Sequence, residues 1–79
     1  MRTKKFTVTA INPDTNKPET FQFDYETYNF ESITAQAEYS ARVHNRWYSN
    51  TEEAIIDLAN YYMRTIDKGF WSIVNVMDD

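Results

Sequence analysis

Residues that could carry out catalysis are scarce in this sequence. It contains one histidine, His44, no cysteine and one glycine. A Ser–His–Asp site would need this histidine together with a serine in a glycine-flanked turn, and no such turn exists. One imidazole supplies too few ligands for a zinc site, and one glycine excludes the usual phosphate-binding loops. We therefore expect a protein that is not an enzyme and that needs no metal or cofactor.

Acidic and aromatic side chains are more informative. Twelve acidic residues stand against eight basic ones, the net charge is −4, and 16% of the residues are aromatic. This sign of charge argues against a general nucleic-acid-binding protein and favours a protein or ribonucleoprotein partner with a basic surface. Tyr and Trp are enriched in binding hot spots, and a core of this size cannot easily bury every ring. The composition therefore favours a binding protein.

Two acidic sets are candidate partner-binding surfaces. Alternation places the first on the outer side of a strand: Gln22, Asp24, Glu26 and Tyr28. Its expected cross-strand neighbours are Thr7 and Thr9, and a merely solvated sheet face is the alternative. The second set lies on the outer side of a helical hairpin: Glu53, Asp57 and Tyr61.

A basic, aromatic set lies near the end of the first predicted helix: Arg42, Arg46, Trp47 and Tyr48. Cations at this position also favour the negative end of the helix dipole, which explains them without a ligand. With Lys4 and Lys5 nearby, the same set could contact a single-stranded nucleic acid, because arginine and stacked aromatic rings are a common combination there.

The clearest structural signal is a helix within the stretch 49–70. Apolar residues recur at the helical period: Ile55, Leu58, Ala59, Tyr62 and Ile66. Ser49 or Asn50 can cap its start, because each has a glutamate three residues later. Gly69, the only glycine, is expected to close the helix in the left-handed conformation.

The remaining strands and helix are predicted from the spacing of apolar residues, which changes along the chain. Alternation predicts strands over 4–11 and 19–28, joined by a turn that holds both prolines. A helical period predicts a helix over 31–48, with His44 on its apolar side. A single long helix is the alternative to two helices, because neither Gly nor Pro separates them. Residues 70–77 predict a third strand that is apolar on both sides, so its second side is covered or forms an interface.

These elements predict one α+β domain of order β-β-α-α-β, in which two helices pack on one face of a three-stranded sheet. We expect the third strand to run parallel to the first and to pair with the second, with pairing to the first as the alternative. The expected core comes from both layers: Phe6, Val8, Phe21, Phe23, Tyr25, Ile33, Ala37, Ile55, Leu58, Tyr62 and Ile66.

The N-terminal residues Met-Arg-Thr-Lys-Lys precede an alternating strand pattern and not an apolar stretch. We therefore expect no secretion signal, a cytoplasmic protein and no membrane partner.

By its length, acidic balance, single histidine, lack of cysteine and surplus of Tyr and Trp, the chain resembles the small phage-encoded inhibitors of bacterial defence, such as anti-CRISPR proteins. The resemblance implies non-catalytic inhibition, in which the protein covers or mimics the nucleic-acid surface of a bacterial complex. Two alternatives remain: a small structural or regulatory phage protein that homodimerises through its C-terminal strand, and a weak nucleic-acid-binding module.

Overall fold

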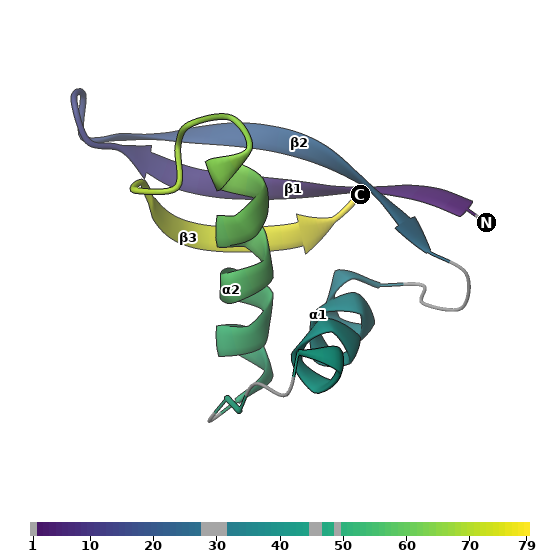
Figure 1. Ribbon diagram of the computed structural model, residues 1–79. Helices are drawn as coiled ribbons and strands as arrows, with labels where there is room; N and C mark the ends of the chain where they lie inside the picture. The colour runs from purple at the N-terminus through teal and green to yellow at the C-terminus, as the bar shows by residue number, and fades with distance from the viewer. Residues whose placement is uncertain (1, 28–31, 45–46, 49) are drawn as a thin grey trace.

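The computed structural model describes residues 2–27, 32–44, 47–48 and 50–79. It confirms the expected α+β class and the order β-β-α-α-β, and the two helices are separate (Figure 1). The elements are β1 (Arg2–Asn12), β2 (Lys17–Thr27), α1 (Ile33–Val43), α2 (Thr51–Arg64) and β3 (Ser72–Asp78).

The β1–β2 hairpin forms because apolar and polar residues alternate on both sides of a polar turn. The strands pair antiparallel without interruption from Arg2–Thr27 to Asn12–Lys17. Asn16 closes the turn in the left-handed region at φ 58°, which asparagine tolerates better than most residues, and its N–H donates to the Asn12 carbonyl at 2.7 Å.

The strand order differs from the expectation. The sheet runs β2-β1-β3, so the third strand pairs with the first, antiparallel to it, and is parallel to the second. The expectation assumed that the helices return the chain to the end of the sheet where it left β2. Instead, α2 runs across the strands, and the loop after it leads to the end of the sheet that holds the β1–β2 turn (Figure 1). From there β3 starts opposite Ile11.

A bulge in β3 explains its apolar character on both sides. The pairing shifts between Thr9 and Ala10 and leaves Val74 as an extra residue. Because the alternation changes phase there, Ile73 and Val76 both lie on the face that the helices cover. The strand therefore does not have two regular apolar faces, although the side chain of Val74 remains 58% exposed.

Helix α2 begins as expected and ends differently. Asn50 is the N-cap, and its side chain accepts the Glu53 N–H at 2.9 Å, whereas Ser49 lies outside the described residues. At the other end the Lys68 N–H donates to the Met63 carbonyl at 2.9 Å, which is one of the two bonds of a Schellman motif.

The left-handed residue of this motif is Asp67, with φ 60°, so the expectation for Gly69 is wrong. Gly69 has another role, because a Cβ atom at this position would overlap the side chain of Arg64. The glycine is required by close packing and not by backbone conformation.

Helix α1 is shorter than the predicted 31–48. Ser32 caps it by accepting the Ala35 N–H at 3.1 Å, and the helix ends before His44, whose ring Nδ1 lies 2.9 Å from the Ser40 carbonyl. His44 was expected on the apolar side of the helix as a core or helix-contact residue. Its side chain is exposed and therefore not in the core, but it lines the groove between the two helices. Trp47, predicted within the helix, lies beyond it and is 86% exposed.

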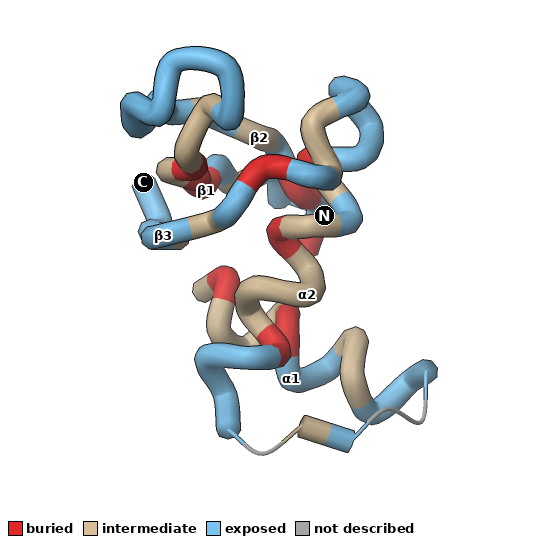
Figure 2. Tube along the Cα trace, turned by 90° about the vertical axis from the view of Figure 1, so that its left-hand side faces the viewer, coloured by how far each residue is buried: buried red, intermediate tan, exposed pale blue. Residues whose placement is uncertain are grey.

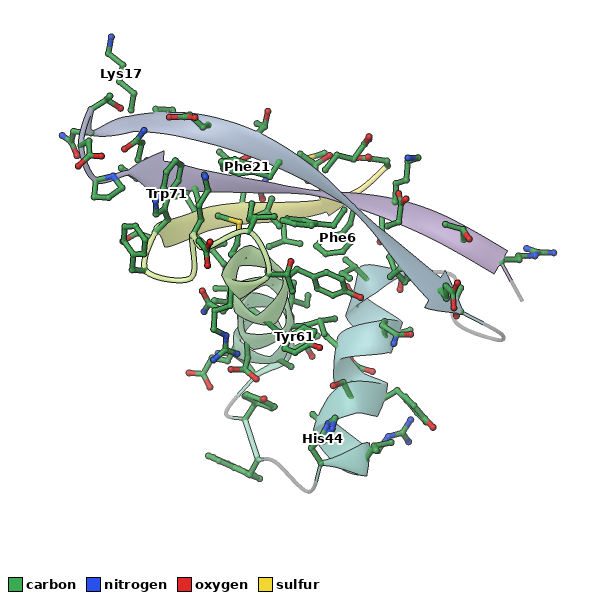
Figure 3. The ribbon with its side chains drawn as sticks, turned by 45° about the horizontal axis from the view of Figure 1, so that its top comes forward. Phe6, Lys17, Phe21, His44, Tyr61 and Trp71 are labelled. Carbon is green, nitrogen blue, oxygen red and sulfur yellow. The ribbon has the colours of Figure 1, made fainter. Side chains whose placement is uncertain are left out.

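The core lies between the sheet and the helices (Figure 2). Phe6, whose ring centroid is 5.0 Å from that of Tyr62, lies between the two layers (Figure 3). Ile66 was expected in the core but is 37% exposed, because it belongs to the closing turn after α2. Met63, which the expected stripe omitted, is fully buried. The buried cluster comprises Phe6, Val8, Ala10, Tyr25, Ile33, Ala59, Met63 and Trp71, with Phe21, Phe23, Leu58, Tyr62, Ile73 and Val76 packed against it.

Candidate functional site

Both helices of the described chain lie on one face of the sheet and leave the other face uncovered (Figure 1). Strand residues that alternate with the core positions point away from α2, and among the described residues no helix or strand packs over them (Figure 1). We call this surface the open sheet face. Its members are Lys5, the threonines Thr3, Thr7, Thr9 and Thr20, and Gln22, Asp24, Glu26, Asn75, Met77 and Asp79.

The acidic strand set predicted from the sequence lies on this face. Gln22, Asp24 and Glu26 are all exposed, and Tyr28 lies outside the described residues. The predicted cross-strand neighbours are only half right: Thr7 lies opposite Gln22, but the neighbour of Asp24 is Lys5. The Lys5 ammonium donates to the Asp24 carboxylate at 3.0 Å, so part of the negative charge is balanced locally.

Asp79 adds a carboxylate that sequence reasoning missed. It accepts the Thr7 hydroxyl at 2.6 Å and also the side-chain amide of Gln22, so it spans the central strand. These two hydrogen bonds lower its pKa below the usual value for an aspartate, with Lys5 contributing by its charge. Because the carboxylate is ionised at neutral pH, the open sheet face carries three acids and one base. No periodicity signals this arrangement, because it depends on the β1–β3 pairing.

The second predicted set does not share this surface. Glu53 lies in the first turn of α2, where a negative charge favourably opposes the helix dipole. Asp57 was expected on the outer side of the hairpin, but it is half-buried and accepts the Tyr48 hydroxyl at 2.7 Å. Tyr61 is 59% exposed, with its ring edge-on to Tyr62 at 5.7 Å. The second set is therefore divided, because α1 packs beside the stripe that holds Asp57 and Tyr61.

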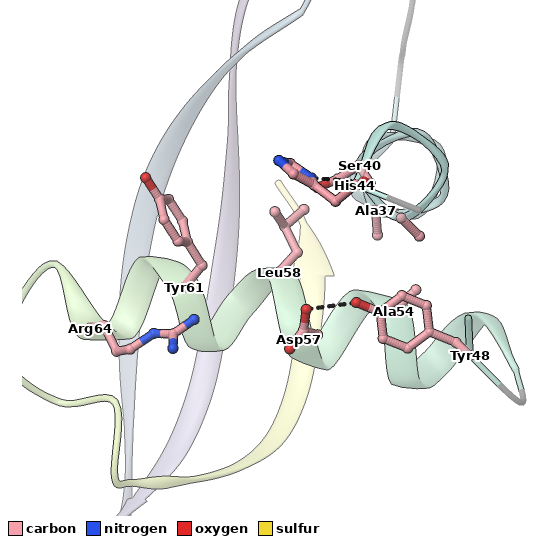
Figure 4. Close-up of a pocket in the computed structure, with 10 residues that line it drawn as sticks. Ala37, Ser40, His44, Tyr48, Ala54, Asp57, Leu58, Tyr61 and Arg64 are labelled. Carbon is pink, nitrogen blue, oxygen red and sulfur yellow. Dashed lines mark hydrogen bonds between the residues drawn. The ribbon is translucent and has the colours of Figure 1, made fainter. Parts of the chain in front are cut away.

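A groove of about 330 Å³ lies between α1 and α2 (Figure 4). Its apolar part is formed by Ala37, Ala54 and Leu58, and its polar part includes Asp57 and Arg64. Asp57 and Tyr61, which were predicted on the outer side of the hairpin, both line this groove.

The basic, aromatic set lies on another side of the helical hairpin. Arg42, Trp47 and Tyr48 line a shallow hollow of about 450 Å³, and Arg46 lies outside the described residues. Trp47 stands out there, because its 86% exposure leaves the indole without a packing role.

The part of the chain described in the structure contains no cluster of three or more His, Asp or Glu side chains suited to a metal ion. Neither α1 nor α2 is long and apolar enough to cross a membrane. Comparison of the chain with protein-family models, curated proteins and solved structures gave no match.

Proposed function

We propose that this protein is a non-catalytic inhibitor that binds a basic, nucleic-acid-binding surface of a bacterial protein or ribonucleoprotein complex. In this role it acts in the cytoplasm of the host cell, as an anti-CRISPR-like protein would. The observation that carries the proposal is the open sheet face, where Asp24, Glu26 and Asp79 lie around a row of threonines and no helix or strand of the described part of the chain covers them.

Two of the three carboxylates of this face are hydrogen-bonded within the protein before any partner binds. Lys5 fixes Asp24, while Thr7 and Gln22 fix Asp79. Preorganised groups lose little side-chain entropy on binding, which favours affinity. A polar face with an excess of carboxylates also selects partners rich in Lys and Arg and increases the rate of association with them.

Self-association is the second candidate function, and one observation favours it. At the edge of the sheet, β3 exposes 58% of Val74 and 59% of Met77. Edge strands with apolar side chains tend to pair with another chain. Pairing with another chain is hindered at the Asp78 end of this edge, however, because α1 lies there. The Ile33 N–H at the start of α1 donates to the Asp78 carboxylate at 2.9 Å. Sedimentation at high micromolar concentration distinguishes a monomer from a dimer.

Competition with nucleic acid tests the first function. The immobilised protein captures its partner from a bacterial lysate, and the purified partner is then titrated with labelled nucleic acid at rising concentrations of the protein. We expect the protein to displace the nucleic acid, and its association rate to fall as salt rises, because exposed charges are screened over about 8 Å at physiological ionic strength. A partner that binds nucleic acid equally well with and without the protein contradicts the proposal.

A further inference from the structure

The side of α1 that faces away from α2 exposes large apolar side chains. Tyr39 is 43% exposed and Val43 58%, and because they are four residues apart they lie next to each other along the helix. Trp47, just beyond the helix, is 86% exposed. Figure 1 shows α2 on one side of α1 and no helix or strand of the described chain on the other. Apolar groups that gather in this way, instead of being scattered, mark an interaction surface.

Two opposite charges of α1 border the same surface. Glu38 and Arg42 line the shallow hollow of about 450 Å³ that Trp47 also lines. They are four residues apart, a spacing at which Glu and Arg can pair within one helix. This pair is not formed, because among the described residues Arg42 has no ion pair or hydrogen bond, and Glu38 accepts the Thr51 hydroxyl at 3.3 Å. The Arg42 guanidinium is therefore available to a carboxylate of another molecule.

A second copy of the chain supplies that carboxylate by symmetry. If two α1 helices pack antiparallel about a two-fold axis midway between Glu38 and Arg42, each Glu38 lies opposite the Arg42 of the other copy. The ion pair then forms twice, as a two-fold interface requires. Ala41, which lines the same hollow, is small and allows the two helices to approach closely. Parallel packing in register would instead set like charges against each other, so the charge order favours the antiparallel arrangement.

We propose that two copies of this protein associate through α1, antiparallel, with reciprocal Glu38–Arg42 pairs flanked by Tyr39, Val43 and Trp47. This interface lies on the helical hairpin, apart from the edge of the sheet at β3, and it does not depend on the function proposed for the open sheet face. Because the helices lie on the opposite side of the sheet, both open sheet faces stay uncovered in the dimer (Figure 1). A dimer of this kind can bind two sites of one assembly and gain avidity.

Sedimentation equilibrium of the whole chain, with charge-swapped variants, tests the proposal. We expect a reversible monomer–dimer equilibrium as the concentration rises into the high micromolar range. Arg42→Glu or Glu38→Arg alone sets two like-charge pairs across the interface and should weaken the dimer at least about tenfold. The double variant Glu38→Arg/Arg42→Glu restores both pairs in reversed order and should dimerise as the wild type does. A strict monomer, or single and double variants of equal affinity with all of them folded by circular dichroism, would overturn the proposal.

Two further measurements distinguish this interface from the β3 edge. An equimolar mixture of the Arg42→Glu and Glu38→Arg variants should form a heterodimer more tightly than either variant associates with itself, because one carries two acids and the other two bases. Val74→Lys, at a 58% exposed position of β3, should leave the dimer unchanged. A dimer that Val74→Lys abolishes and Arg42→Glu leaves intact would assign self-association to the β3 edge and contradict the role of α1.

Discussion

The two faces of the sheet are built from alternating residues of the same strands but have opposite properties. On the helix-covered face, Phe6 and Val8 are fully buried. One residue further along β1, Thr7 and Thr9 lie on the open sheet face beside exposed carboxylates. One face therefore stabilises the fold, and the other can be altered for binding with little effect on stability.

The adjacent acids Asp78 and Asp79 show the same contrast. Asp78 lies on the covered side, where its carboxylate accepts the Tyr25 hydroxyl at 3.1 Å and the Ile33 N–H at 2.9 Å. Asp79 lies on the open sheet face with Thr7 and Gln22. Asp78 therefore connects the edge strands β2 and β3 to the start of α1, whereas Asp79 is part of the exposed surface.

The largest difference between the faces should appear in the core. Phe6→Ala removes a fully buried ring and should lower the free energy of unfolding by about 3–5 kcal/mol. Thr9→Val on the open sheet face should change it by no more than about 0.5 kcal/mol, because the Thr9 side chain makes no hydrogen bond among the described residues and is not part of the core. Urea unfolding of both variants measures the contrast. A similar loss of unfolding free energy in the two variants would show that the open sheet face also stabilises the fold and would contradict this contrast.

The paired acids should give a smaller difference. Asp78→Ala leaves the Tyr25 hydroxyl and the first N–H of α1 without their acceptor and should cost about 1–3 kcal/mol. Asp79→Ala should have a smaller effect, since its partners can turn to water. Chemical unfolding compares them, and an equal or larger loss for Asp79→Ala would contradict the assignment of the two residues to different faces.

The smallest difference lies in the pH dependence of stability. Burial, assisted by the hydrogen bond to Asp78, raises the pKa of Tyr25 from 10.0 to about 12. The folded state retains this proton longer than the unfolded state, so the stability from Tyr25 is present below pH 10 and is lost between pH 10 and 12. On the open sheet face the pKa of Asp79 is lowered, so its contribution is lost in acid, as pH falls through that lowered value.

Unfolding midpoints measured from acid to alkaline pH should therefore separate the faces. The alkaline decline ends near the Tyr25 pKa of about 12, and the acidic decline follows the lowered pKa of Asp79. Tyr25→Phe should flatten the alkaline decline, and Asp79→Asn should flatten the acidic one. Tyr62, whose pKa burial also raises, should leave part of the alkaline decline in place. If Tyr25→Phe flattened the acidic decline, or Asp79→Asn the alkaline one, the assignment of the two declines to these residues would be contradicted.

Local patterns predicted much of this fold. Alternation in β1 and β2 identified the hairpin and placed Asp24 and Glu26 on the outer face, because side-chain direction in a strand depends only on neighbouring residues. The cap at Asn50 was also identifiable, because a helix cap depends only on residues a few positions apart.

Features that depend on distant parts of the chain were not predicted. The order β2-β1-β3 follows from the direction in which α2 crosses the sheet, which no local pattern reveals. The bulge at Val74 disrupts the alternation that sequence reasoning relies on. The position of Asp79 above Thr7 requires that strand order, and the groove at Asp57 requires the packing of two helices.

Capture of partners by three forms of the protein tests most directly whether the open sheet face is the binding surface. The forms are the wild type, the double variant Asp24→Lys/Glu26→Lys, and the control Asp14→Lys/Glu52→Lys, which changes the charge equally at exposed positions outside this face. Quantitative mass spectrometry then compares the proteins retained from one bacterial lysate. We predict a partner held by the wild type and the control but lost by the sheet variant, with all three equally folded. A partner retained by all three forms would contradict the account.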